Sequence, residues 1–148
     1  FSCHIQLFNA NVQIFLMSVD YIKIIGGQKN FAEFYNLTNN GYGYQGSGSD
    51  IAKSMASTSG WTTAPTAGTV GNDQASNNSS GFTALPGGGR DISGPYYIIG
   101  YNGYWWSSTE NSSTYAAWYR YMFYDNTNVT RFNDYKQDGF SVRCVRDF

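Results

Sequence analysis

The sequence predicts one domain in which short helices and antiparallel strands are joined by long, ordered loops. Its 148 residues are enough for a single hydrophobic core. Gly, Ser, Asn and Thr together make up 58 of the 148 residues, which is typical of a chain rich in loops. The aromatic content of 18% is too high for a disordered chain. This combination favours a binding module over a helical bundle or a doubly wound enzyme.

The balance of charge excludes two classes of partner. The chain has 9 Lys and Arg residues against 10 Asp and Glu residues, which gives a formal net charge of -1. Nucleic acids and anionic membrane surfaces are bound by clustered basic side chains, so we expect neither as a partner. We expect no membrane insertion either, because the longest apolar run near the start, residues 14–17, is far too short to span a bilayer.

The first 29 residues are expected to form strands that precede the main domain, residues 30–148, either as an addition to it or as an assembly element. Residues 5–25 are rich in Ile, Val, Phe and Leu, and Gly26 and Gly27 end this stretch. Strands are predicted over residues 5–8, 12–19 and 21–25. Because the chain begins with Phe rather than Met, we expect a processed start or a fragment, with any signal peptide already removed.

Two short helices are predicted in the first half of the main domain. Residues 30–38 place most of their apolar side chains on one face of a helix. Asp50 is expected to cap a second helix over residues 51–56, in which Ile51 and Met55 lie one turn apart and are buried.

Residues 58–90 show almost no periodicity and are predicted to form one long irregular loop. A loop of this length is normally either functional or disordered. Isolated apolar residues indicate that it is held in place; they are Trp61, Val70, Phe82 and Leu85. The three glycines at 87–89 lack both the strand–turn–helix setting and the Lys of a phosphate-binding loop, so we do not expect nucleotide binding.

Alternating apolar and polar residues predict strands in the second half of the chain. The first two are short and cover residues 96–99 and 104–108. Three antiparallel strands are expected to follow, over residues 115–124, 128–133 and 140–146.

The turn after residue 124 decides which side chains of this predicted hairpin share a face. A two-residue turn at residues 126–127 would place Tyr121 opposite Phe132. A turn one residue longer would change the pairing of every side chain, because successive side chains of a strand point to opposite faces. The shorter turn is favoured, since it keeps the apolar residues together.

The two-residue turn divides the hairpin into two faces. One face carries Tyr119, Tyr121, Phe123, Thr130 and Phe132, and Asn133, Asp134 and Tyr135 continue this row. The other face carries Trp118, Met122 and Tyr124 against Val129 and Arg131, and is expected to seal the interior. Tyrosine is common on binding surfaces because it offers a large, rigid contact area with only two torsions to fix. The alternative, that the first row packs inside the domain, stays open, since aromatic strands are often core.

Three ordered motifs resemble a known family. They are Ser-Ser-Gly-Phe-Thr-Ala-Leu-Pro-Gly-Gly at residues 79–88, Gly-Tyr-Trp-Trp-Ser-Ser-Thr-Glu at 103–110, and Gly-Phe-Ser-Val-Arg-Cys-Val-Arg-Asp at 139–147. In this order and spacing they resemble the Fibrobacter-type major paralogous domain family, which belongs with the formylglycine-generating-enzyme type of C-type lectin fold. The resemblance covers residues 50–147. It implies an α+β, C-type-lectin-like fold, with a small twisted antiparallel sheet, two helices and long ordered loops. The framework residues would be Trp105, Trp106, Phe140, Val142 and Cys144.

The resemblance also implies a way in which the binding surface varies. Relatives with this ending serve as variable proteins of diversity-generating retroelements, in which adenine-directed mutation rewrites chosen Asn codons before the last strand. Such codons can become Tyr, Phe, Thr or Asp, but not Trp, Met, Lys or Gln. The residues that are reachable in this way form the predicted ligand-binding site: Tyr115, Tyr119, Tyr121, Phe123, Asn126, Thr130, Phe132, Asn133, Asp134 and Tyr135.

The sequence contains no recognisable catalytic or metal-binding constellation, so we expect no enzyme, no cofactor and no metal. The single His4 lies in the N-terminal segment, and no Gly-x-Ser-x-Gly motif is present. Cys3 and Cys144 show no zinc-ligand spacing, and they do not match the cysteine pair of the formylglycine-generating enzymes. Whether these cysteines form a disulfide or stay as buried thiols is left open, with thiols favoured.

The expected function is therefore that of a non-enzymatic, receptor- or adhesin-type module. It would bind a protein or glycan ligand on another cell or surface. The resemblance implies display outside a bacterial cell, on the cell surface or on a phage particle. The alternative is a structural domain of a bacterial surface appendage or of a multidomain extracellular protein. In that case, residues 1–29 would pair with the sheet edge of a neighbouring copy and form a homo-oligomer.

Overall fold

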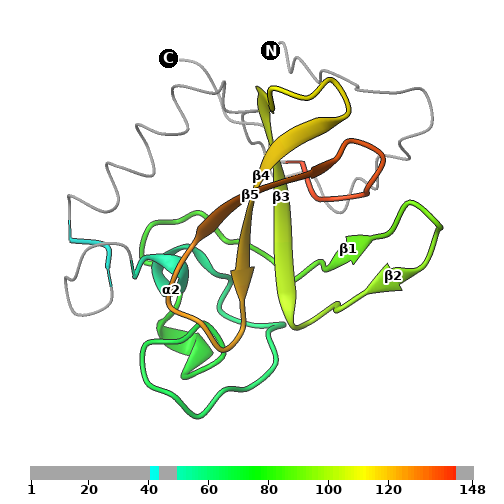
Figure 1. Cartoon of the computed structure of the whole chain (residues 1–148). Coiled ribbons are helices and arrows are strands. Elements are labelled where there is room, and N and C mark those ends of the chain that lie inside the picture. The colour runs from blue at the N-terminus through cyan, green and yellow to red at the C-terminus, as the bar shows by residue number, and fades with distance from the viewer. Residues whose placement is uncertain (1–40, 44–49, 143–148) are drawn as a thin grey trace, which may run out of the picture.

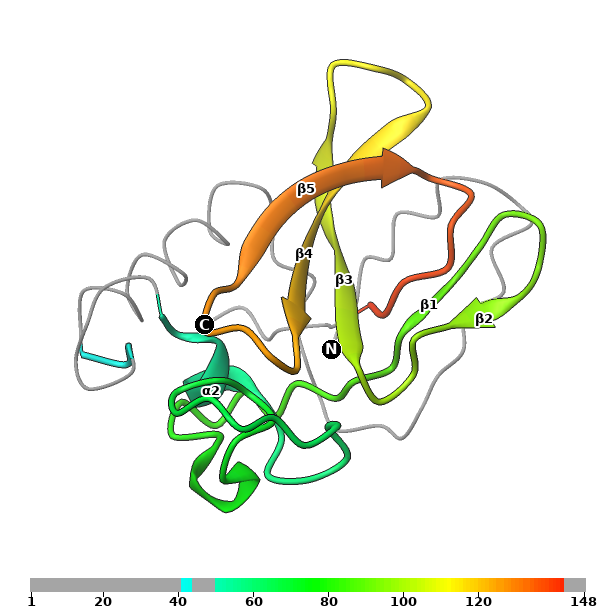
Figure 2. The same ribbon diagram turned by 60° about the horizontal axis from the view of Figure 1, so that its bottom comes forward.

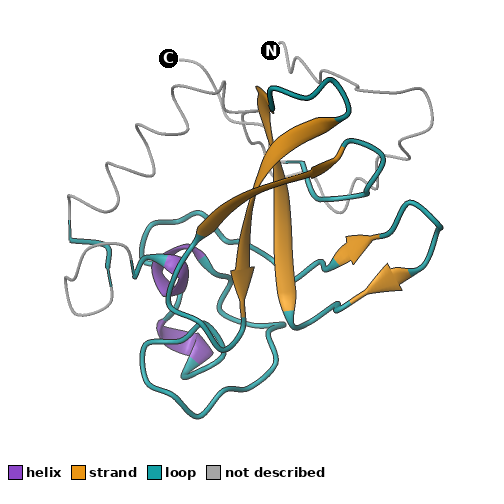
Figure 3. Cartoon of the chain, in the orientation of Figure 1, coloured by secondary structure: helices purple, strands orange, loops and turns teal. Residues whose placement is uncertain are grey.

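The computed structural model describes residues 41–43 and 50–142 (Figure 1). Strands contain more residues than helices in this part of the chain, and its helical segments are short (Figure 3). The elements are α2 (Ala52–Met55), the 3-10 helix η2 (Gln74–Ser76), β1 (Gly89–Arg90), β2 (Tyr96–Tyr97), β3 (Asn102–Glu110), β4 (Ala116–Phe123) and β5 (Thr130–Tyr135). The predicted strands within residues 5–25, the predicted helix over 30–38 and both cysteines lie outside the described residues.

The strands form two antiparallel sheets. One contains β1 and β2, and the other is the central sheet, with the order β3-β4-β5. The β1–β2 hairpin extends from one side of the central sheet, whereas α2 and the irregular loop after it lie at one end (Figure 2). The prediction of a small antiparallel sheet with few helices is confirmed. Within the described residues, the only α-helix is the single turn of α2, and none is long and apolar enough to cross a membrane.

The hairpin of β4 and β5 forms, but its register differs from the predicted one. Tyr119 lies opposite Phe132 and Tyr121 opposite Thr130, so the predicted pairing of Tyr121 with Phe132 is wrong by two residues. The connection between the strands has six residues, 124–129, instead of the two predicted. Because the difference is an even number of residues, the alternating side chains from Tyr119 to Phe123 and those of Thr130 and Phe132 keep the face assigned to them.

The longer connection has a tertiary cause. The carbonyl oxygens of Tyr124 and Asn126 accept hydrogen bonds from the amides of Gly71 and Val70, at 2.6 and 3.3 Å. The carbonyl of Thr127 accepts a third one, from the amide of Ala52 at 3.0 Å. These backbone groups bond to the irregular loop and to α2, so they are not available for pairing across a tight turn.

Helix α2 begins differently from the prediction. Asp50 does not cap it: a carboxylate oxygen of Asp50 accepts a hydrogen bond from the hydroxyl of Thr127 at 3.0 Å, and the N-cap residue is Ile51. The side chain of Ile51 is fully buried, as predicted, whereas Met55 is half-buried. The N-terminal end of this helix is therefore attached to the β4–β5 connection.

The predicted irregular loop is confirmed, and a buried lysine holds it in place. The ammonium group of Lys53 donates hydrogen bonds to the carbonyl oxygens of Asn72 and Asp73 and to the side chain of Asn77. Asn77 in turn donates to the carbonyl oxygen of Val70 at 3.1 Å. Burial lowers the pKa of Lys53, and the nearby Asp73 partly opposes this effect. Of the apolar residues predicted to hold the loop, Trp61 and Val70 are buried and Phe82 is half-buried, but Leu85 is exposed.

The core lies between this loop, α2 and one face of the central sheet. Ile51, Val70, Met122 and Val129 are buried together, with Trp105 and Tyr124 packed against them. The prediction that Met122 and Val129 seal the interior is confirmed. It is wrong for Trp118 and Arg131, because Arg131 is exposed and its guanidinium carbon lies 3.8 Å from the ring centroid of a half-buried Trp118. This contact is a cation–π interaction at the surface.

Two further strand predictions are corrected. The strand predicted over residues 96–99 ends after Tyr97, because Ile98 adopts a left-handed conformation with φ of 49°. The last strand was expected to be antiparallel, but its described part, up to Val142, forms an isolated parallel bridge between Ser141 and Trp105. After β5 the chain turns back toward β3, so Phe140 lies over the central sheet.

Candidate ligand-binding face

The face of the central sheet opposite the core is lined with aromatic side chains. Among the residues that strand register and alternation place on it, eight concern the site: two of β3, three of β4 and three of β5. They are Tyr104, Trp106, Tyr119, Tyr121, Phe123, Thr130, Phe132 and Asp134, and we call them the aromatic face. Neighbouring rings touch across the strands. The ring centroid of Tyr119 lies 5.8 Å from that of Trp106 and 6.3 Å from that of Phe132.

One half of the aromatic face is covered by the chain itself. Phe140 packs on it, with its ring centroid 4.9 Å from that of Tyr104 and 4.8 Å from that of Tyr119. Tyr119 is only 7% exposed, and Tyr104 is buried as well. The prediction that Tyr119 points to solvent is therefore wrong. The register was not the cause; the C-terminal segment returns over the sheet and covers this residue.

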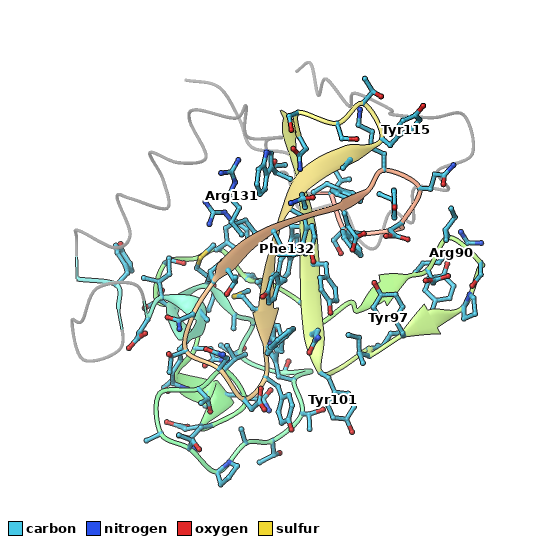
Figure 4. The ribbon with its side chains drawn as sticks, in the orientation of Figure 1. Arg90, Tyr97, Tyr101, Tyr115, Arg131 and Phe132 are labelled. Carbon is cyan, nitrogen blue, oxygen red and sulfur yellow. The ribbon has the colours of Figure 1, made fainter. Side chains whose placement is uncertain are left out.

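The other half of the aromatic face is open. The side chain of Phe132 is 56% exposed, and Figure 4 shows it on β5 near the middle of the central sheet. Tyr121 and Phe123 are half-buried, with their ring centroids 4.8 Å apart, and Thr130 is half-buried beside them. A continuous aromatic ladder thus runs from the buried Tyr119 to the exposed Phe132.

The ten predicted site residues do not all share this face. Six of them belong to it: Tyr119, Tyr121, Phe123, Thr130, Phe132 and Asp134. Asn133 and Tyr135 point to the opposite face, because β5 continues as far as Tyr135 and the alternation continues with it. Tyr115 precedes β4 and is highly exposed (Figure 4), and Asn126 lies in the β4–β5 connection.

A pair of carboxyl groups lies at the covered end of the aromatic face. Asp138 is 8% exposed, and one of its oxygens accepts a hydrogen bond from the amide of Ile92 at 3.1 Å. Burial, and then the neighbouring carboxylate of Asp134, raise the pKa of Asp138 to about 6. Burial also raises the pKa of Tyr119 to about 12, with Asp134 as the next cause. Burial, and then the neighbouring Tyr104, raise the pKa of Tyr97, whose ring contacts that of Tyr104.

Sequence reasoning missed Tyr97, Tyr104 and Asp138, and it assigned Trp106 to the framework alone. The alternation of the motif at residues 103–110 could have placed Tyr104 and Trp106 on one face. No signal in the sequence relates Tyr97 or Asp138 to them, since those contacts depend on how the β1–β2 hairpin and the C-terminal segment fold back. Among the described residues, no group of three or more His, Cys, Asp or Glu side chains could hold a metal ion.

Comparison with known proteins identifies a family and no individual relative. The family model of the Fibrobacter succinogenes major domain matches residues 25–146. No curated protein and no solved structure shows a significant similarity to the chain.

Proposed function

The chain belongs to the Fibrobacter succinogenes major domain family, and for this member we propose a non-enzymatic ligand-binding function, of the receptor or adhesin type. The open half of the aromatic face is the binding surface. One observation carries the proposal: Phe132 is 56% exposed at the end of an aromatic ladder with Tyr121 and Phe123. Contiguous exposed aromatic side chains on a small domain are typical of an interaction site.

The ligand is a protein or a glycan on another cell or surface. The rings of the open half would supply apolar contact. The polar groups of Thr130 and Asn126, at the edge of this surface, would supply hydrogen bonds. We place the domain outside the bacterial cell, on its surface or on a phage particle, where such a ligand is accessible.

We also propose that the finer fold is the C-type lectin fold of the formylglycine-generating-enzyme type. The features that support it are the antiparallel order β3-β4-β5 and the long ordered loop between α2 and β1. In this arrangement the loop is fixed to the core side of the sheet, so it leaves the open half of the aromatic face free for binding.

The binding function is tested by replacing Phe132 with alanine. Wild-type protein would be applied to arrays of immobilised glycans and of peptides, and its affinity for the bound probes measured. We expect F132A to weaken this binding at least tenfold, because an aromatic side chain at the centre of an interface contributes about 2 kcal/mol or more.

The matched control for this test is Tyr101→Ala. Tyr101 is exposed to a similar extent, 47%, but lies just before β3 and far from Phe132 in Figure 4. We expect Y101A to bind like the wild type. The proposal is wrong if the wild type binds no probe, or if F132A binds as tightly as Y101A.

A second prediction concerns the diversification of this surface by a retroelement. Sequencing the gene from many related isolates should show substitutions concentrated at the reachable positions, whereas the interleaved Trp118 and Met122 stay constant. Because Tyr119 is buried beneath Phe140, we expect it to vary only among large apolar and aromatic residues. Substitutions spread evenly over the gene would contradict retroelement diversification and leave the binding proposal standing.

A further inference from the structure

A buried lysine and a buried asparagine meet where α2 contacts the irregular loop. The ammonium nitrogen of Lys53 lies 2.9 Å from the side-chain oxygen of Asn77, and 24 positions separate the two residues in the sequence. Lys53 is only 9% exposed and Asn77 only 6%. Lysine is almost never buried to this extent unless its charge is paired. This pair therefore calls for an explanation of its own.

The three groups that accept hydrogen bonds from Lys53 are all uncharged. They are the side-chain oxygen of Asn77 and the carbonyl oxygens of Asn72 and Asp73. The carboxylate of the exposed Asp73 favours the charged form of Lys53, but burial is the stronger effect and lowers the pKa. A buried charge that is hydrogen-bonded only to neutral groups costs free energy. Conversion of the ammonium group into a neutral amide would remove this cost.

The carboxamide of Asn77 is fixed at both of its polar atoms. Its nitrogen donates hydrogen bonds to the carbonyl oxygens of Ser57 and Val70, at 2.9 and 3.1 Å. Its oxygen accepts the hydrogen bond from Lys53. The amide group is therefore held in one orientation, with its carbonyl end toward the lysine.

The backbone holds the two segments together on either side of the pair. The amide of Asn78 donates to the carbonyl oxygen of Lys53 at 3.1 Å, and the amide of Ser80 to that of Ser54 at 3.0 Å. Because a C=O bond is about 1.2 Å long, the lysine nitrogen lies within about 4 Å of the carbonyl carbon of Asn77. Reacting atoms that are held this close need little further movement to form a bond.

We propose that Lys53 and Asn77 form an intramolecular isopeptide bond, which links α2 covalently to the end of η2. The chain makes this modification on itself, from two side chains that already touch. The proposal is independent of the ligand-binding function, because the pair lies on the core side of the central sheet.

The reaction is an exchange of one amide for another. The ammonium group of Lys53 first gives up a proton, which its burial favours, and the free amine attacks the carbonyl carbon Cγ of Asn77. The Nζ–Cγ bond forms and the Cγ–Nδ2 bond breaks, while a second proton moves from Nζ to Nδ2. Ammonia leaves and takes up the first proton, so the products are a secondary amide and an ammonium ion. No bond changes its oxidation state, and no further reactant is consumed.

The site contains groups that assist the departure of ammonia. The carbonyl oxygens of Ser57 and Val70 already accept hydrogen bonds from the leaving nitrogen, so they can stabilise the ammonia as it forms. The reaction happens once in the lifetime of each molecule, and a slow rate is therefore sufficient. The product closes residues 53–77 into a covalent ring, which restricts the unfolded chain and prevents local opening of the irregular loop.

The bond is tested by trypsin digestion and mass spectrometry of the full-length wild-type protein. Trypsin cleaves after Lys and Arg, and its sites around the pair are Lys29, Lys53 and Arg90. An acylated lysine is not cleaved. We expect a single peptide, residues 30–90, that is lighter than its sequence by one ammonia molecule. The intact protein should be lighter by the same mass, and fragmentation of the peptide should place the link.

Two variants provide the controls. Lys53→Arg keeps a positive charge at this position without an amine that can be acylated, and we expect full mass and cleavage after residue 53. Asn77→Ala removes the acyl group, and we expect full mass and cleavage after Lys53. If N77A fails to fold, K53R and the wild type still decide the question.

A different loss of ammonia can be distinguished from the proposed bond. A succinimide at Asn102, which precedes a glycine, would give the same change of mass. It would leave Lys53 open to cleavage, however, so the uncut peptide is the decisive observation. The proposal is wrong if the wild type has the full mass and is cleaved after Lys53, or if N77A still yields the uncut peptide. Neither result affects the binding surface around Phe132, which F132A tests separately.

Discussion

Replacing Tyr119 with alanine is expected to destabilise the domain by about 3–5 kcal/mol, the usual cost of removing a large buried aromatic side chain. The ring of Tyr119 lies among those of Trp106, Tyr121, Phe132 and Phe140, so its loss leaves a cavity beneath the C-terminal segment. Thermal unfolding followed by circular dichroism should show a decrease in melting temperature of about 10 °C or more.

The control is Phe132→Ala, on the directly opposite position of β5. Phe132 is mostly exposed, and we expect its truncation to cost less than about 1 kcal/mol. The two variants thus separate the framework half of the aromatic face from its binding half. An equal loss of stability in both would mean that Phe132 also belongs to the core, and that the binding surface is misplaced.

The second large effect is expected from Gly88→Ala. Gly88 has φ of 61°, and a Cβ atom there would lie 2.2 Å from the carbonyl oxygen of Tyr97 and 2.9 Å from the amide nitrogen of Ile99. Both neighbours are backbone atoms and cannot rotate away. We expect a loss of about 4 kcal/mol or more, measured by urea-induced unfolding, because the backbone of residues 97–99 must move.

The neighbouring Gly87 provides the control for this prediction. A Cβ atom at Gly87 would meet only the side-chain oxygen of Ser141, at 3.4 Å, and that side chain can rotate. We expect G87A to unfold within about 1 kcal/mol of the wild type. A mild effect of G88A would contradict the close approach of residues 97–99 to the glycine run. This close packing, rather than phosphate binding, explains why glycines stand at 88 and 89.

The sequence predicts the two faces of the β4–β5 hairpin well, because alternation is a local property. Met122 is buried and Phe132 is exposed, as their positions in the pattern indicate. The irregular loop is also predictable, since its Gly, Ser, Asn and Thr residues disfavour regular structure. The register was not predictable in the same way, because it depends on hydrogen bonds from Gly71 and Val70, far away in the sequence.

The missed features share one physical origin, which is contact between distant segments. In the sequence Asp50 resembles a helix cap, but its carboxylate accepts a hydrogen bond from the hydroxyl of Thr127 instead. In the sequence Lys53 resembles an ordinary solvent-exposed lysine, yet its ammonium group donates hydrogen bonds to three groups of the irregular loop. Asp138 is an ordinary turn residue in the sequence, and only the folded chain brings it beside Asp134 and buries it. Local patterns contain no information about such pairs.

The six-residue connection between β4 and β5 has a consequence for how members of this family can differ in length. Its backbone is held by the loop and by α2, so the two strands do not rely on a tight turn for their alignment. Residues can therefore be gained or lost within the connection without turning the rings from outside to inside. A gain or loss of one residue within β4 or β5 would instead move every side chain beyond it to the other face, and selection would remove it.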